Sequence, residues 1–156
     1  MTNALIFFAI QYFFFQLTLT IFLHRGIAHR CFTFQLWFSH VCRFILWIHG
    51  RLGPNYLQYY AALHRKHHVH SDTIDDPHSP YNGPFLDIID RNQRTTNYYI
   101  TNDEVNKYAP DIKPSTDWIE VNLYQAYPNL GRVIIALIYL ILFGPIGALF
   151  YFVVSF

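Results

Sequence analysis

The feature that most constrains this chain is the absence of charged side chains from both of its ends. Every Lys, Arg, Asp and Glu of the 156 residues lies between Arg25 and Arg132, so residues 1–23 and 133–156 carry none. Soluble proteins contain about 25% charged residues, whereas this chain has 13%, with 53% hydrophobic residues. This distribution excludes an ordinary globular protein, a disordered chain and a nucleic-acid-binding protein, which would need a basic surface.

The two charge-free ends contain apolar runs long enough to cross a bilayer. Residues 4–23 are interrupted only by isolated Gln and Thr, and residues 133–156 mainly by Gly144 and Pro145. At 1.5 Å per residue, a 20-residue helix reaches about 30 Å, the thickness of the hydrocarbon core. Both runs are therefore predicted to be transmembrane helices, the second kinked at Pro145.

The region between the two runs holds all the Lys and Arg, so the positive-inside rule places it on the cytoplasmic side. Residues 31–50 are also apolar, but Arg43 and the neighbouring polar side chains fall on one arc of a helical wheel, which predicts an interfacial helix. Residues 54–130 are predicted to be cytoplasmic, with a short helix at residues 85–89. The predicted fold is an all-α integral membrane protein with a cytoplasmic helical cap, a single domain over residues 1–156.

A cluster of three histidines lies in the predicted helix that begins at Pro54. His64, His67 and His68 project within an arc of about 100° on an α-helix, whereas His70 points elsewhere. Three imidazoles on one face do not suit a solvated helix, because neutral histidines are poor helix formers and protonated ones repel each other. The spacing therefore predicts three metal ligands.

A second histidine pair, His24 and His29, comes directly after the first apolar run. On an unbroken α-helix the two side chains would be about 140° apart, so one metal ion could not easily take both. Either the helix unwinds at Gly26, or the two histidines serve two different metal ions. Because the other cluster is predicted on the same side of the membrane, both histidines are predicted to be ligands.

The ligand types narrow the choice of metal. Five neutral imidazoles favour Fe, Zn, Cu or Ni over Mg or Ca. Five are too many for one four-coordinate zinc site and too few to fill two octahedral irons. Asp72, Asp75 and Asp76 come after the second cluster, where they either accept hydrogen bonds from the N–H groups of ligating histidines or simply form a turn. No catalytic residue beyond the metal ligands is predicted.

Together the clusters resemble the histidine boxes of the membrane-bound fatty acid desaturases, in particular the Δ9 acyl-CoA/acyl-lipid branch. His24 to His29 looks like the first box, HxxxxH. Residues 64–80, HRKHHVHSDTIDDPHSP, look like the second box, HxxHH, with its acidic turn and DPH. The resemblance runs from about residue 15 to the C-terminus.

The resemblance implies a non-haem di-iron centre, two Fe with O₂ as co-substrate, that introduces a cis double bond into a saturated acyl chain. The substrate would be an acyl-CoA, an acyl-ACP or an acyl-lipid, and membrane lipid would surround the protein. Electrons would come from cytochrome b5, a ferredoxin or a rubredoxin with its reductase. Two alternatives stay open: a related di-iron membrane hydroxylase, and a non-catalytic or degenerate metal-binding membrane fragment.

The family's third box, a second HxxHH, has no counterpart in these 156 residues, so the chain looks like the middle of a desaturase. We expect the 156-residue chain alone to be inactive, because the ligands of that box are missing. Iron content and oleate formation in a desaturase-deficient host test this expectation. Substantial activity from these residues alone would contradict it.

Overall fold

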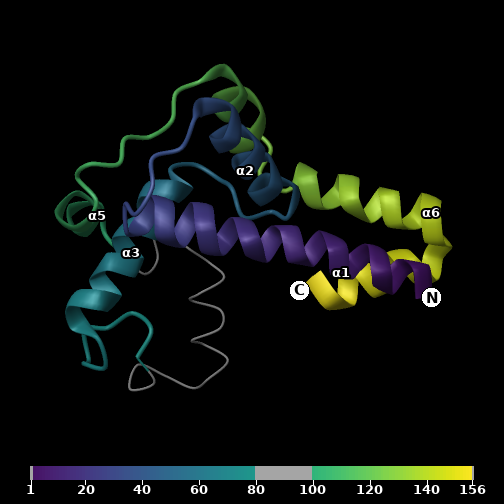
Figure 1. The fold of residues 1–156 in the computed structure, drawn as a ribbon, viewed down its shortest axis with the longest axis horizontal. Helices are drawn as coiled ribbons and strands as arrows, with labels where there is room; N and C mark the ends of the chain where they lie inside the picture. Colours follow the sequence, from purple (N-terminus) through teal and green to yellow (C-terminus); the bar gives the residue numbers. More distant parts are fainter. Residues whose placement is uncertain (1, 80–99, 156) are drawn as a thin grey trace. The chain divides into compact units, whose positions relative to one another are not determined.

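The protein is helical, and its computed structural model describes residues 2–79 and 100–155 (Figure 1). The predicted short helix at residues 85–89 lies outside the described residues. The helices in chain order are α1 (Thr2–Leu17), the π-helix η1 (Thr18–Ala28), α2 (Leu36–Ile48), α3 (Tyr56–His70), α5 (Asn102–Tyr108), the π-helix η3 (Glu120–Gln125) and α6 (Leu130–Ser155).

These helices form two compact units. The apolar unit consists of Met1–Phe22, Phe34–Pro54 and Thr116–Phe156, and it contains α1, α2, η3 and α6. The histidine unit consists of Leu23–Thr33 and Asn55–Ser115, and it contains the end of η1 together with α3 and α5. All of the predicted metal ligands lie in the histidine unit.

Within the described residues, two helical stretches are long and apolar enough to cross a membrane. The first is Thr2–Ala28, in which α1 continues into η1, and the second is Leu130–Val154. Only 11% and 17% of their most apolar windows are buried within the protein. A core helix of a soluble protein would be mostly buried, so the exposure of these side chains supports the membrane-associated fold that the sequence predicts.

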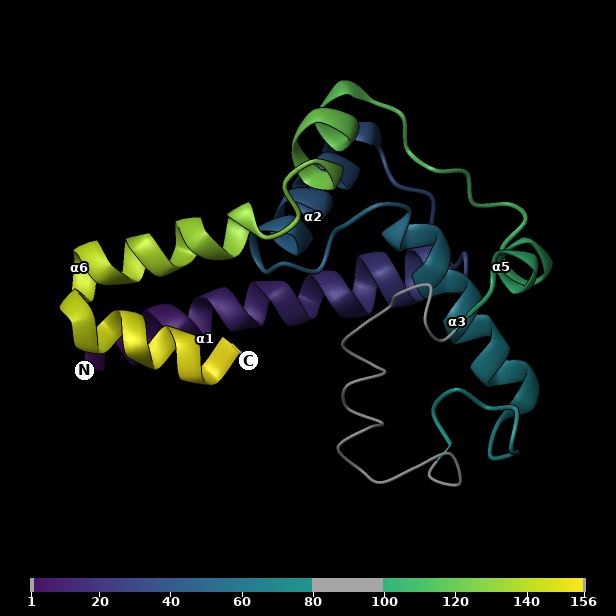
Figure 2. The same cartoon turned by 180° about the vertical axis from the view of Figure 1, so that it is seen from behind.

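The second stretch reverses direction within α6. Gly144 has non-helical dihedral angles, φ 69° and ψ −172°, a conformation that glycine adopts without steric cost. The rings of Tyr139 and Tyr151 stack with centroids 5.0 Å apart, although twelve residues of straight helix would separate them by about 18 Å. The arm after Gly144 therefore turns back in the direction of the arm before it, and Figure 2 shows the two arms meeting at the turn. The sequence predicted a kink at Pro145, and the structure has a full reversal there.

A chain of polar contacts links α1, α2 and α6 inside the apolar unit. The side chain of Gln11 lies between His49 and Tyr139: its Nε2 is 3.1 Å from His49 Nε2, and its Oε1 accepts from the Tyr139 hydroxyl at 3.3 Å. The Nδ1 of His49 is 2.7 Å from the carbonyl oxygen of Ile45. Polar side chains between apolar helices commonly bind the helices together in this way.

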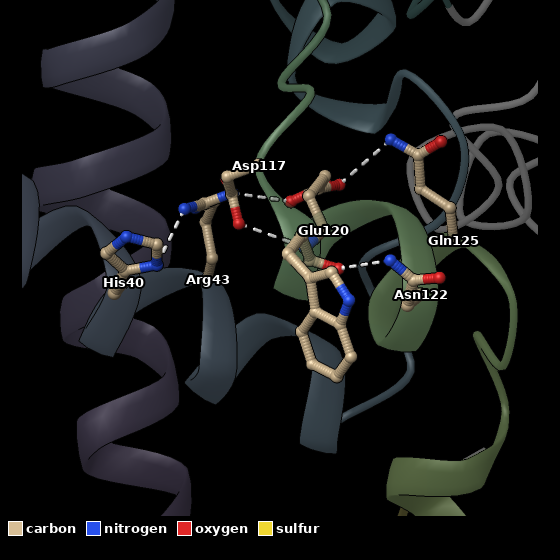
Figure 3. A network of polar contacts seen from close by, with 7 residues as sticks. His40, Arg43, Asp117, Glu120, Asn122 and Gln125 are labelled. Carbon is tan, nitrogen blue, oxygen red and sulfur yellow. Dashed lines mark hydrogen bonds and ion pairs between the residues drawn. The ribbon is translucent and has the colours of Figure 1, made fainter.

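A buried ion network joins α2 to the start of η3 (Figure 3). Arg43 Nη1 donates to Asp117 Oδ2 at 2.6 Å and to Glu120 Oε2 at 2.7 Å, while its Nη2 lies 2.8 Å from His40 Nδ1. The side chains of Arg43 and Glu120 are 3% and 4% exposed. Buried charges persist only when they are paired, so Arg43 acts here as an internal connection between two segments.

The opposite side of α2 is apolar and exposed. Trp37, Val41 and Phe44, which are spaced four and three residues apart, form one face of this helix, with 63%, 47% and 45% of their surfaces exposed. With 13 residues, α2 is about 20 Å long, which is too short to cross a bilayer. An apolar exposed face on a short helix suits a position in the membrane interface, and the predicted interfacial location stays a prediction.

The core of the histidine unit joins α3, α5 and the end of η1. Half of the buried residues in this cluster are alanines: Ala28, Tyr59, Ala61, Ala62, Leu63, Ile100, Val105 and Ala109. A capping box between Thr101 and Glu104 begins α5, and Lys66 on α3 reaches Glu104 with a 2.6 Å ion pair. Hydrogen bonds from Lys66 and then Thr101 lower the pKa of Glu104 to about 2, so this carboxylate stays charged at neutral pH.

We expect Gln11→Leu to destabilise the packing of α1 against α2 and α6 by about 1 kcal/mol, because it leaves His49 and Tyr139 without their shared partner. Gln16→Leu is the matched control: Gln16 is exposed on the same helix, and its Nε2 donates to Tyr12 of that helix. Denaturant unfolding in detergent micelles measures both variants. Equal changes in the free energy of unfolding would contradict the role assigned to Gln11.

Candidate metal centre

The first histidine pair owes its geometry to the π-helix η1. The N–H of His29 donates to the carbonyl of His24 at 3.0 Å, the five-residue hydrogen bond that defines a π-helix. The wider turn brings side chains five residues apart toward one face, and the two Nε2 atoms lie 3.2 Å apart. The 140° separation expected on an α-helix does not arise. Neither alternative drawn from the sequence, unwinding at Gly26 or service to two ions, is needed to bring the pair together.

The second pair stands one α-helical turn apart on α3. The Nε2 atoms of His64 and His68 are 3.0 Å apart, and His64 Nε2 is also 3.0 Å from His29 Nε2. The rings of His24 and His64 lie with centroids 4.5 Å apart. The four histidines thus form one cluster, in which each offers a ring nitrogen and all four nitrogens lie within 4.8 Å of one another.

The spacing of this cluster fits the coordination sphere of one metal ion. Ligand nitrogens at 2.0–2.1 Å around a tetrahedral ion lie about 3.3 Å apart, close to the 3.0–3.2 Å between successive Nε2 atoms. Four imidazole nitrogens with no carboxylate among them suit Zn, Fe or Cu better than Mg or Ca. The cluster therefore fits one transition-metal ion. Two of the ligands would come from η1 and the residue directly after it, and the other two from α3.

The cluster also favours the protonation state that metal binding needs. Burial lowers the pKa of His64 to about 3, with further contributions from the imidazoles of His24, His68, His29 and His67. Burial, followed by His24, His68 and Arg65, lowers the pKa of His29 as well. Both rings are therefore neutral at neutral pH and have a lone pair to offer a metal ion.

His67, the fifth predicted ligand, lies beside this cluster and outside the group of four. Its Nδ1 is 2.8 Å from Asp76 Oδ1, and its ring centroid is 5.1 Å from that of His78 and 5.4 Å from that of His68. An Asp that binds Nδ1–H directs the lone pair to Nε2. His67 therefore has the hydrogen-bonded arrangement of a metal-ligating histidine, although it is not among the four histidines whose nitrogens converge.

Of the three predicted acidic partners, Asp76 is the one that contacts a histidine. Its side chain is 1% exposed and also accepts the main-chain N–H groups of Asp72 and His78, at 2.9 and 2.8 Å. Asp72 and Asp75 are exposed. His70, which the sequence did not predict to be a ligand, instead contacts α5: its Nε2 is 2.9 Å from the hydroxyl oxygen of Tyr108.

Comparison with known proteins gives one partial match. The hex-5-enoyl-[acyl-carrier protein] acetylenase of Moorena producens (strain JHB) is 45% identical to this chain over 58 residues. The matched stretch is 37% of this chain and 17% of that protein, so the chain corresponds to a small part of it. No protein-family model matches the sequence, and no solved structure matches it significantly. The similarity is to an enzyme that modifies fatty acyl chains.

We expect His64→Ala to lower the affinity for Co²⁺ or Zn²⁺ at least about tenfold, or about 1.4 kcal/mol, because its Nε2 lies closest to two other ligand atoms. His70→Ala is the control on the same helix and should leave the affinity unchanged. Titration of the purified chain in micelles, followed by the absorption of bound Co²⁺, measures both. If the two variants bind equally well, the four-histidine cluster is not the metal site.

Proposed function

We propose that this chain is part of a membrane-bound, oxygen-dependent oxidoreductase that introduces an unsaturated bond into a fatty acyl chain. The observation that carries the proposal is the convergence of four Nε2 atoms from two separate segments, His24 and His29 in one and His64 and His68 in the other. These segments have the HxxxxH and HxxHH spacings of the desaturase boxes.

The acetylenase that matches part of this chain supports the same chemistry. Its name describes an acetylenase that acts on an acyl chain attached to acyl-carrier protein. Forming an unsaturated carbon–carbon bond removes hydrogens from an apolar chain, which requires an oxidant. We therefore propose a fatty acyl substrate, with acyl-ACP, acyl-CoA and acyl-lipid as the candidate carriers and a cis double bond, at Δ9 in the resemblance, as the product.

The histidines and Asp76 would have different roles in binding the metal. His24, His29, His64 and His68 would bind one iron through their Nε2 atoms, and Asp76 would hold His67 with its Nε2 available for a second. Bound iron would supply the redox chemistry with which O₂ oxidises an unactivated carbon chain. His29 and His64, whose pKa values are lowered, need lose no proton before a metal ion binds at neutral pH.

The exposed apolar helices indicate where in the cell the proposed enzyme would act, namely at a membrane. Side chains along α1 and α6 are largely exposed, with Ile6 at 55%, Phe13 at 61% and Ile141 at 80%. We propose that both lie in lipid and that the histidine cluster faces the cytoplasm, where a cytochrome b5, ferredoxin or rubredoxin with its reductase would deliver electrons. A substrate with a long apolar chain reaches such a site from the bilayer.

A second function is favoured by one specific observation. The spacing of the four nitrogens also suits tetrahedral zinc, which has no redox chemistry. A membrane protein that binds zinc without catalysis would keep the same cluster. A related membrane hydroxylase would use the same iron chemistry with an alcohol as product.

The test uses the complete reading frame that contains these residues, expressed in a desaturase-deficient host, with fatty acids analysed by mass spectrometry. We expect new unsaturated acyl chains, their loss in His64→Ala and their retention in His70→Ala. Hydroxylated chains would overturn desaturation in favour of hydroxylation. Bound zinc, no new fatty acid and no O₂ uptake under reducing conditions would overturn the oxidoreductase proposal altogether.

A further inference from the structure

The side chain of Arg65, the residue after His64 on α3, connects the two histidine segments. Its three nitrogens make five hydrogen bonds: Nε to the carbonyl of Ala28 at 2.7 Å, Nη2 to that of Ile27 at 3.1 Å, Nη1 to that of Tyr108 at 3.1 Å, and Nη1 and Nη2 to Asp111 at 2.6 and 3.3 Å. A guanidinium has five N–H groups in a rigid fork, so every one of them has a partner.

The carbonyls that Arg65 binds are those at the ends of two helices. The carbonyls of residues 24–26 accept hydrogen bonds from main-chain N–H groups just after η1. The last two carbonyls of η1, those of Ile27 and Ala28, accept hydrogen bonds from Arg65. Tyr108 is the last residue of α5. Carbonyls at helix C-termini have no partner within their helix and favour a nearby cation. One side chain therefore caps η1 and α5 together.

These caps sit directly beside the metal ligands. Ala28 precedes His29, and Arg65 comes after His64, so the 2.7 Å contact from Arg65 to Ala28 lies next to the 3.0 Å contact between the two imidazoles. The apolar core brings η1 and α3 together through Ala28, but apolar contact has no directionality. The hydrogen bonds of a planar guanidinium do have it, and they fix how far one segment slides along the other.

Asp111 holds this guanidinium in place. It binds both terminal nitrogens of Arg65 and also pairs with Arg30, two residues after the end of η1. Although burial by itself raises the pKa of Asp111, hydrogen bonds from Arg65 and Arg30 lower it to about 2. The carboxylate also offsets a positive charge that would otherwise repel a metal ion nearby.

We propose that Arg65 is a positioning residue: by capping η1 and α5 at once, it sets the separation of His29 and His64 and so the geometry of the metal site. The inference rests on the proposed function in taking the four histidines as metal ligands. It assigns Arg65 no contact with substrate or metal. The direction of the expected change in metal affinity distinguishes this role from a charge effect. Removing a cation near a metal site would raise metal affinity on electrostatic grounds alone, whereas loss of a positioning residue lowers it.

The experiment compares Co²⁺ binding by the purified full chain in micelles with that of Arg65→Met, Arg65→Lys and Lys66→Met. We expect both Arg65 variants to bind Co²⁺ about 10- to 100-fold more weakly, the range known for residues that support metal ligands, with an altered visible spectrum. Arg65→Lys keeps the positive charge but lacks the planar, forked arrangement of N–H donors. Lys66→Met removes the neighbouring cation, whose partner is Glu104, and should keep the wild-type spectrum.

Circular dichroism checks that each variant is folded, and Arg65→Lys decides the outcome if Arg65→Met does not fold. Wild-type affinity and spectrum in a folded Arg65 variant would overturn the inference, as would tighter binding by Arg65→Met. The failure of the proposed function looks different: the wild-type chain itself would then bind no Co²⁺ at the histidines.

Discussion

The candidate metal centre depends on one main-chain hydrogen bond, from the N–H of His29 to the carbonyl of His24. This bond widens the end of the first apolar helix into a π-helix, and the widening turns two side chains toward one side. Without it, His64 and His68 would face a single histidine from the other segment. Because π-helices are rare and are frequently found at functional sites, the distortion itself supports a binding role for this end of the helix.

Two buried or half-buried arginines organise the two units in different ways. In the apolar unit, Arg43 joins two carboxylates, so α2 and η3 are connected by charge. In the histidine unit, Arg65 binds chiefly main-chain carbonyls, so it connects whole segments regardless of their side chains. In both units the apolar contacts bring helices together, and the directional guanidinium bonds determine their register.

Periodicity and composition predicted part of this structure well. The apolar runs could be derived from hydropathy, the shared face of His64 and His68 from 100° per residue, and the break near Pro145 from the proline itself. The proximity of His24 and His29 could not, because that rule fails in a π-helix. The role of Arg65 was equally invisible, since its acceptors are mostly carbonyls, which every residue has. His67 lay within the predicted arc, but its contact with Asp76 depends on the fold of the turn.

The reversal at Gly144 changes how the end of the chain would be threaded through a bilayer. A straight α6 would carry the chain from one leaflet to the other. The arm before Gly144 is about 20 Å long, and the arm after it returns beside the first. The residues after the reversal thus run back toward the end where α6 begins. The two ends of α6 therefore lie on the same side of the turn at Gly144, so in a bilayer α6 would form a hairpin instead of a single straight span.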